Sequence, residues 1–250
     1  MFKRIPSRRA VAACAKLHGY RLERRWPWFI RAEGKDLNLG FEDLLEYQYC
    51  RSRRFMVLSV GAFDGLANDP IGKFARSHDC RGIMIEPQPG VFDRLCANYR
   101  DFPGIRPLNV AIGRVSGTLP LYQVPAGAAG LPEWTEQLAS FEREHLLKHE
   151  SDVPGLTAHI RAIEVSVLSF ADLLDRYDVR RIDVLQVDAE GMDARLLAWF
   201  PFERMRPAIL HYETAHMSAT EKSETRNRLE TFGYQVREAD SATDDMAWVT

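Results

Sequence analysis

The 250-residue chain lacks the features that define several protein classes. No window contains the roughly 18 uncharged apolar residues that a membrane span needs, and the N-terminus has too short an apolar run for a secretory signal. Internal repeats and low-complexity segments are also missing. The four cysteines form no C-x-x-C pair, which argues against a zinc ribbon or a disulfide framework and favours a reducing cytoplasm.

An excess of one charge is also missing overall, because the formal net charge is −2. Basic residues nevertheless concentrate in residues 1–35, which contain ten Lys or Arg and two Glu. This segment is either a solvated helix with a basic face or a patch for an anionic lipid, a nucleic acid or a partner. No nucleic-acid-binding motif accompanies it, so we expect no nucleic-acid partner and at most a weak peripheral membrane contact.

What the sequence does contain is an alternation of apolar strands and amphipathic helices. A helix over residues 39–52 precedes it, and helices of eleven to twelve residues separate most of the strands. This alternation predicts βαβ units and a mostly parallel sheet with helices on both faces. The last two segments are expected to form a terminal strand pair. The predicted strands cover residues 55–63, 82–86, 105–113, 182–188, 208–213, 233–240 and 245–250.

The alternation is interrupted between the third and fourth strands. Residues 118–122 are expected to form a short extra strand, residues 125–134 a Gly/Ala/Pro loop, and residues 135–150 a helix. Such an insert is where a lid or an acceptor pocket can be built. We therefore divide the chain into an N-terminal helical extension (1–54) and a main domain (55–250) that contains a helical lid insert (123–165). The predicted acceptor contacts in the insert are Trp134, Ser140 and Phe141.

The predicted helix over 135–150 also carries Glu142, His145 and His149 on one face. These side chains are the types that bind metal ions. They are also what the polar face of an amphipathic helix contains, and we consider this second interpretation the simpler one.

The first strand ends in a glycine loop with the sequence G-A-F-D-G, residues 61–65. Glycine lets backbone N–H groups approach a ligand without interference from a Cβ atom. The spacing differs from the G-x-G-x-x-G of NAD sites. The next strand ends in Glu86, about 20 residues after the loop, where an acidic residue of a doubly wound sheet binds ribose hydroxyls.

Carboxylates also follow the later strands. Asp188 and Glu190 lie at the end of the fourth predicted strand, where they could hold a cofactor, bind a divalent cation, act as a general base or cap the next helix. His211 and Glu213 share a face of the fifth strand, also near its carboxyl end. The candidate catalytic residues are Asp188, His211 and Glu190, and Glu213 is a candidate acceptor contact.

Taken together, four segments resemble the FkbM family of S-adenosylmethionine-dependent methyltransferases. They are GAFDG, IEPQPGVFDRLCANY, NVAIG and LQVDAEGMDARLL, within a region from about Phe55 to Glu213. The E-P-x-P-x-x-F-x-x-L-x-x-N and D-x-E-G patterns are specific in combination. The chain departs from the family pattern at Ser59, where relatives typically carry Asp.

The resemblance implies a Rossmann-like, seven-stranded methyltransferase sheet, mostly parallel, with an antiparallel terminal strand. It also implies S-adenosylmethionine as cofactor and a hydroxyl acceptor on a sugar, glycan or secondary metabolite, whereas a divalent metal requirement stays open. Carried over by position, the residues expected to bind the cofactor are Gly61, Ala62, Phe63, Asp64, Gly65, Glu86, Pro87, Gln88, Asn109, Val110, Ala111 and Asp188.

Two other functions use the same sheet. A nicotinamide-dependent oxidoreductase is the alternative enzyme, and the glycine spacing argues against it. A non-catalytic cofactor-binding scaffold is the alternative outside enzymes, and the polar residues Asp188, Glu190 and His211 argue against it.

Overall fold

The computed structural model describes residues 31–32, 35–36, 40–67, 69–239 and 243–249. The basic N-terminal segment lies outside these residues except where it forms β1 (Arg31–Ala32) and part of β2 (Lys35–Asp36). Among the described residues, no helix is both long enough and apolar enough to cross a membrane.

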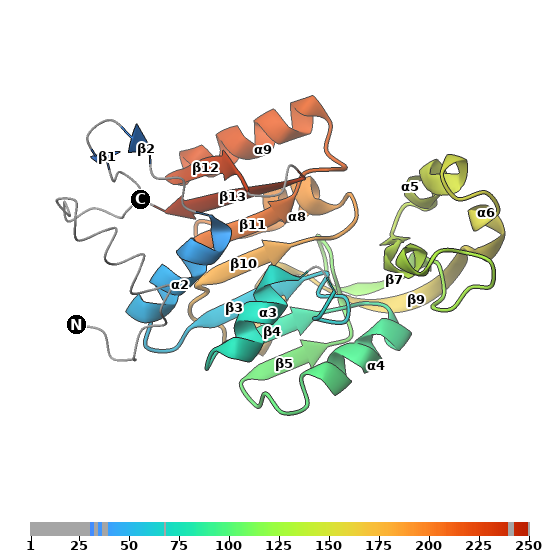
Figure 1. The fold of residues 1–250 in the computed structure, drawn as a ribbon, viewed down its shortest axis with the longest axis horizontal. Helices are drawn as coiled ribbons and strands as arrows, with labels where there is room; N and C mark the ends of the chain where they lie inside the picture. Colours follow the sequence, from blue (N-terminus) through green and yellow to red (C-terminus); the bar gives the residue numbers. More distant parts are fainter. Residues whose placement is uncertain (1–30, 33–34, 37–39, 68, 240–242, 250) are drawn as a thin grey trace.

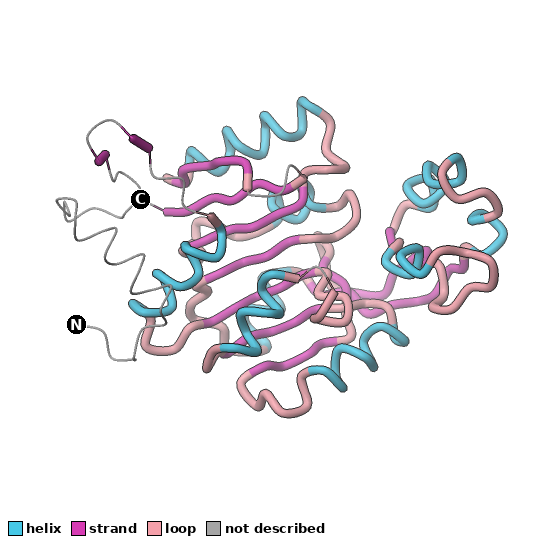
Figure 2. The backbone as a smooth tube through the Cα atoms, in the orientation of Figure 1, coloured by secondary structure: helices cyan, strands magenta, loops and turns pink. Residues whose placement is uncertain are grey.

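Seven strands form the central sheet, which Figures 1 and 2 show face on. Their order is β12-β13-β11-β10-β3-β4-β5, and β13 runs antiparallel to both of its neighbours while the other pairs are parallel. This is the expected methyltransferase sheet. The strands are β3 (Met56–Val60), β4 (Arg81–Ile85), β5 (Ile105–Leu108), β10 (Val184–Val187), β11 (Ile209–Glu213), β12 (Tyr234–Glu238) and β13 (Asp244–Val249).

Helices cover both faces of the sheet because each strand presents apolar side chains alternately to one face and the other. Val57 and Ile209 pack with α2 (Phe41–Arg51), α3 (Pro70–Ser77) and α4 (Pro89–Asn98). The side chains at the alternate positions of the strands point to the other face of the sheet. The helices that pack on that face are α7 (Phe170–Arg176), α8 (Asp193–Trp199) and α9 (Ala219–Thr231).

The strand order also fixes where a ligand can bind. From β3 the chain proceeds outward through β4 to β5, and then returns to β10 on the other side of β3. A crevice opens outside the carboxyl ends of the strands at such a switch point. The loops after β3, β4 and β10 therefore meet there.

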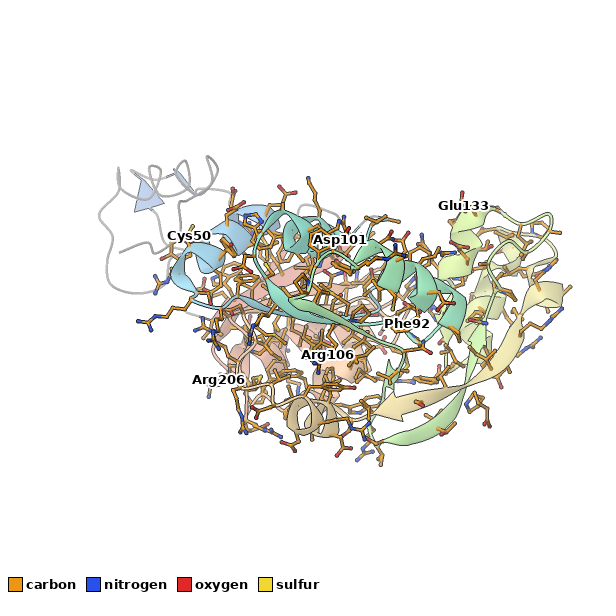
Figure 3. All side chains as sticks on the ribbon, turned by 90° about the horizontal axis from the view of Figure 1, so that it is seen from below. Cys50, Phe92, Asp101, Arg106, Glu133 and Arg206 are labelled. Carbon is orange, nitrogen blue, oxygen red and sulfur yellow. The ribbon has the colours of Figure 1, made fainter. Side chains whose placement is uncertain are left out.

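An insert of residues 117–168 departs from this alternation and projects from the core (Figure 1). It is built on β7 (Gly117–Gln123) and β9 (Arg161–Leu168), with β8 (Ala139–Ser140) at one edge and β6 (Ala111–Ile112) at the other. Glu133 lies at its far end, opposite Cys50 of the core (Figure 3). Four short helices complete it: η1 (Glu133–Gln137), α5 (Arg143–Leu147), η2 (Lys148–Ser151) and α6 (Leu156–His159).

Two of the predicted elements are wrong in this region. The helix expected over 135–150 is divided into η1, β8, α5 and η2, because residues 139–140 pair with Tyr122 and Gln123 of β7. The strand expected over 105–113 is also divided, because it leaves the central sheet after Leu108 and joins the insert sheet as β6. β9 was not predicted at all.

Candidate cofactor site and active site

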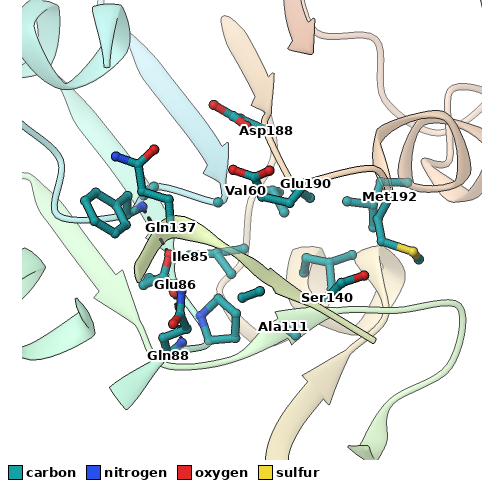
Figure 4. Close-up of a pocket in the computed structure, with 18 of the residues that line it drawn as sticks. Val60, Ile85, Glu86, Gln88, Ala111, Gln137, Ser140, Asp188, Glu190 and Met192 are labelled. Atoms are coloured by element: carbon teal, nitrogen blue, oxygen red, sulfur yellow. Dashed lines mark hydrogen bonds between the residues drawn. The ribbon is translucent and has the colours of Figure 1, made fainter. Parts of the chain in front are cut away.

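A cavity lies at the switch point, between the carboxyl ends of β3, β4 and β10 and the underside of the insert. Figure 4 shows Glu86 and Gln88 on one side of it, Ser140 and Met192 on another, and Asp188 and Glu190 on a third. The lining residues are Val60, Gly61, Ala62, Phe63, Ala67, Asp69, Ile85, Glu86, Pro87, Gln88, Ala111, Ile112, Leu121, Gln137, Ala139, Ser140, Phe141, Gln186, Asp188, Ala189, Glu190, Met192 and Leu196.

The glycine loop approaches the β10 loop so closely that one position admits no side chain. Gly61 has φ 77°, and a Cβ atom there would lie 1.6 Å from the carbonyl oxygen of Asp188. The amides of Gly61 and Ala62 both donate to the carbonyl oxygen of Ile85, which fixes the loop to the end of β4. Glycine is therefore required at 61 for the two cavity walls to meet.

Glu86 is held at the end of β4 by the backbone of two neighbouring loops. One carboxylate oxygen accepts from the Phe63 amide at 3.1 Å, and the other accepts from the Gln88 amide at 2.8 Å. Burial raises the pKa of Glu86 to about 7, against the effect of these two hydrogen bonds and of Arg94. Each oxygen retains a lone pair, so the carboxylate can also accept from a ligand hydroxyl.

A second polar group faces the cavity from the sheet. Gln186 of β10 is buried, and its Oε1 atom has no hydrogen-bond partner among the described residues. Asp69, the N-cap of α3, lies beside it, and burial raises the pKa of Asp69 despite hydrogen bonds that include Gln186. An orphaned acceptor next to a carboxylate suits a ligand that donates hydrogen bonds, such as an ammonium group.

The end of β10 contributes the acidic groups. Asp188 is exposed to the cavity, yet the surrounding protein atoms desolvate its carboxylate and raise its pKa well above the usual value. The neighbouring charges of Asp193, Glu190, Asp244 and Asp69 raise it further. A carboxyl group in this position is suited to exchange a proton with a ligand.

The turn after Asp188 is held by Asp193, at the start of α8. Its carboxylate accepts from the amides of Ala189 at 3.1 Å and Gly191 at 3.2 Å. Burial raises the pKa of Asp193 to about 7. These hydrogen bonds position Glu190, which has φ 47° and lines the cavity.

The insert closes the remaining side. Gln137, Ser140 and Phe141 line the cavity from η1, β8 and the segment after it. Their position is fixed by Glu136, whose carboxylate pairs with Arg94 of α4 at 2.5 Å and whose carbonyl accepts from Gln88 at 3.2 Å. These contacts connect the insert to the loop that carries Glu86.

Most predicted site residues meet in this cavity. Of the twelve proposed cofactor contacts, those that line it are Gly61, Ala62, Phe63, Glu86, Pro87, Gln88, Ala111 and Asp188. Glu190, Ser140 and Phe141 line it as well. Their roles toward a ligand stay predictions.

His211, one of the predicted catalytic residues, is not among the residues that line the cavity. The alternation of β11 turns its side chain toward α2, where the ring stacks on Phe41 with centroids 4.2 Å apart. Its Nε2 atom lies 3.7 Å from a carboxylate oxygen of Asp244. His211 is therefore a buried residue of the core and does not line the cavity.

Asn109 does not line the cavity either. Its side-chain amide donates to the carbonyl oxygens of Glu86 at 2.9 Å and Pro87 at 3.0 Å, and so supports the loop after β4. Asp64 accepts from amides within its own loop. The predicted residues that do not line the cavity are Asp64, Gly65, Asn109, Val110, His211, Glu213 and Trp134.

Three polar side chains that line the cavity were not among the predicted site residues: Asp69, Gln137 and Gln186. Asp69 has a capping function that accounts for it in the sequence. Gln186 had the clearest signal, because a polar residue inside an apolar parallel strand needs a partner.

A family model described as the methyltransferase FkbM domain matches residues 59–236. No sequence among the curated proteins matches the chain. Ser59, where the family typically has Asp, is fully buried and does not line the cavity.

Three solved structures illustrate the range of similar folds. Methyltransferase FkbM from Methylobacillus flagellatus KT is 13% identical, with a TM-score of 0.49, covering 98% of this chain and 56% of that one. The METTL16 MTase domain is 10% identical, with a TM-score of 0.46 and coverages of 98% and 80%. Aeropyrum pernix fibrillarin, in complex with natively bound S-adenosyl-L-methionine, is 13% identical, with a TM-score of 0.38 and coverages of 78% and 66%.

Proposed function

This chain belongs to the FkbM family of methyltransferases, and we propose that it transfers a methyl group from S-adenosylmethionine to a hydroxyl oxygen of a sugar, glycan or secondary metabolite. The observation that carries the proposal is the meeting of Gly61, Glu86 and Asp188 in one cavity at the switch point. The choice of a hydroxyl acceptor is supported by the carboxylates at the cavity wall, since an alcohol needs a proton acceptor as it attacks.

The residues present fit S-adenosylmethionine. Glu86 offers lone pairs to the two ribose hydroxyls, and Gly61 provides a surface without a side chain for the methionine portion. The orphaned Oε1 atom of Gln186 is a suitable acceptor for the amino group. When bound, S-adenosylmethionine supplies an electrophilic methyl group on a sulfonium centre.

The residues of the chain then orient the acceptor and accept its proton. Methyl transfer depends on alignment of the acceptor oxygen with the methyl group, so positioning accounts for much of the rate. Asp188 is the proposed general base because it is exposed to the cavity at the end of β10. Ser140 and Phe141, on the insert, are placed to contact the acceptor and to exclude water.

The test is transfer of a labelled methyl group from S-adenosylmethionine to a panel of hydroxylated sugars, glycans and metabolites. With an accepted substrate, Asp188→Asn is expected to lower kcat by at least about 100-fold, because a general base contributes roughly that factor. Binding of S-adenosylmethionine by the variant, measured by calorimetry, should change far less.

Asp64→Asn is the matched control. Its carboxylate accepts from the amides of Leu66 and Ala67 and does not line the cavity, so activity should stay within about twofold of wild type. If the labelled methyl group were found on an amine nitrogen or a thiol sulfur instead of an ether oxygen, the proposed hydroxyl acceptor would be contradicted. Unchanged turnover of Asp188→Asn would remove Asp188 as the base.

A further inference from the structure

A second group of polar side chains lies at the rim of the cavity, where the insert meets the core. It consists of His145 of α5, Glu190 in the turn after β10, and His216 in the turn after β11. One ligand atom from each, two imidazole nitrogens and a carboxylate oxygen, lies within 4.8 Å of the others. Three segments that are distant in the sequence therefore bring metal-binding atoms to one point.

The spacing within the group is close to that of a coordinated ion. The Nε2 atom of His216 lies 3.4 Å from a carboxylate oxygen of Glu190. Two ligand atoms that each lie about 2.1 Å from a tetrahedral metal ion are roughly 3.4 Å apart, so this pair already has the required separation. The imidazole of His145 lies beside His216, with ring centroids 4.9 Å apart.

His145 gives an independent indication that the group can bind a ligand. Its Nε2 atom is buried and has no hydrogen-bond partner among the described residues. A buried polar nitrogen without a partner costs free energy, which a metal ion or another ligand would recover.

The turn after β10 is shaped to hold this imidazole. Gly191 has φ 91°, and a Cβ atom there would lie 2.4 Å from Cε1 of His145. Glu190, next to it, has φ 47°, a left-handed conformation that is unfavourable for a residue with a side chain. The backbone thus leaves room for the His145 ring and turns the Glu190 carboxylate toward it.

We propose that His145, Glu190 and His216 bind a divalent transition-metal ion of the zinc or cobalt class. Two imidazoles and one carboxylate match the ligand preference of these ions, whereas magnesium and calcium prefer ligand sets made only of oxygen. Three protein ligands leave a coordination position for water or for an oxygen of the acceptor.

Such an ion would have a clear structural consequence. His145 belongs to the insert, whereas Glu190 and His216 belong to loops at the carboxyl edge of the core sheet. The ion would join the two parts of the molecule at the cavity rim, because Glu190 also lines the cavity. Metal binding here does not depend on the identity of the methyl acceptor.

The alternative is a metal-free contact, in which a protonated His216 pairs with Glu190 and with Glu213, whose carboxylate oxygen lies 3.8 Å away. This alternative predicts no affinity for a transition metal and leaves the His145 nitrogen without a partner.

The experiment uses the full chain after chelator treatment and dialysis. Titration with Co²⁺ should give a one-to-one complex with visible absorption bands typical of a four- or five-coordinate ion. Zn²⁺ should displace Co²⁺, and millimolar Mg²⁺ should not. His145→Ala and His216→Ala should each weaken Co²⁺ binding by at least about tenfold, with a smaller loss for Glu190→Gln.

His159→Ala is the matched control, because His159 lies in α6 of the same insert and outside the group. Its affinity should equal that of wild type. A second measurement needs only the wild-type protein: Zn²⁺ should slow proteolysis within residues 124–160. The proposal would be overturned if the wild-type protein formed no one-to-one complex, or if His145→Ala and His216→Ala bound Co²⁺ as tightly as wild type. Both outcomes are independent of the methyltransferase activity.

Discussion

The core sheet and the insert line the same cavity with different kinds of groups. The core contributes backbone and buried acids: Gly61 approaches the Asp188 carbonyl directly, and Glu86 is held by two amides. The insert contributes side chains, among them Ser140 and Phe141, from a small sheet with short helices. It also has an apolar cluster of its own, which includes Val124, Leu138, Leu146 and Leu156.

This difference separates two tasks. A wall made of backbone, whose position is fixed by the strand order, can change its shape little. Such a wall suits the cofactor, because the same cofactor is bound in every turnover. A side-chain wall on a separate small unit can vary without disturbing the sheet, which suits an acceptor. We therefore expect changes at Gly61 and Glu86 of the core wall to affect cofactor binding strongly, and changes at the insert to affect it weakly.

The largest effect is expected for Gly61→Ala. The new Cβ atom would overlap the Asp188 carbonyl oxygen, so the β3 and β10 loops would have to separate. We expect a loss of stability of about 3 kcal/mol or more, beyond the roughly 1 kcal/mol that a left-handed alanine costs. S-adenosylmethionine binding should fall below detection by calorimetry.

Gly130→Ala separates the cost of the left-handed backbone conformation from the cost of steric overlap. Gly130 has φ 81°, close to that of Gly61, but no atom lies within 4 Å of its Cβ position. Gly130 belongs to the insert. Gly130→Ala should therefore lower the stability only by the cost of a left-handed alanine, and the cofactor affinity should be unchanged. Equal effects of the two substitutions would contradict the distinction between the walls.

An intermediate effect is expected from the ionisation of Glu86. Burial raises the pKa of Glu86 to about 7 when no ligand is bound, and ribose hydroxyls donate to the ionised form. Binding therefore releases a proton, and affinity rises with pH until Glu86 is ionised. Calorimetry should give an S-adenosylmethionine Kd about tenfold lower at pH 8 than at pH 6.

Glu86→Gln should remove this part of the pH dependence and weaken binding at pH 8. Comparison of the two proteins isolates Glu86 from other groups that titrate in the cavity. If the variant keeps the tenfold change, Glu86 is not the group responsible.

The smallest effect is expected at the joint between the two regions. Arg94→Ala removes the partly buried ion pair with Glu136 that holds the insert on α4. A pair of this kind contributes about 1 kcal/mol, so backbone amides of η1 and β8 should exchange hydrogen roughly fivefold faster. The cofactor Kd should change by less than about threefold.

Arg180→Ala provides the comparison for Arg94→Ala. Arg180 pairs with Asp178 at an exposed position outside the insert, so its loss should leave exchange in the insert unchanged. A large loss of cofactor binding in Arg94→Ala would show that the insert and the core wall are not separable.

The same contrast explains what the sequence could predict. The core strands are short apolar runs with polar ends, and the predicted spans of β4, β10 and β11 differ from the observed ones by one or two residues at an end. In the insert, local periodicity misleads. Residues 135–150 have helical spacing, but pairing with β7, a partner outside the segment, makes residues 139–140 a strand. β9 was missed, although the alternation of Ile163, Val165 and Val167 is typical of a strand.

The site follows the same rule. Residues fixed by strand ends, such as Gly61, Glu86 and Asp188, reach the cavity because topology brings those ends together. His211 does not, since a strand side chain can face either layer and Phe41 of α2 covers this one. The proximity of His145 to His216 depends on the fold of the insert, which a single sequence does not reveal.

The central claim is that the switch-point cavity binds S-adenosylmethionine. Calorimetric titration of the wild-type chain with S-adenosylmethionine, S-adenosylhomocysteine and NAD tests it most directly. We predict one-to-one binding of the first two with micromolar Kd and no binding of NAD, because the loop has the G-x-x-x-G spacing. Binding of NAD without binding of either adenosyl compound would contradict the account.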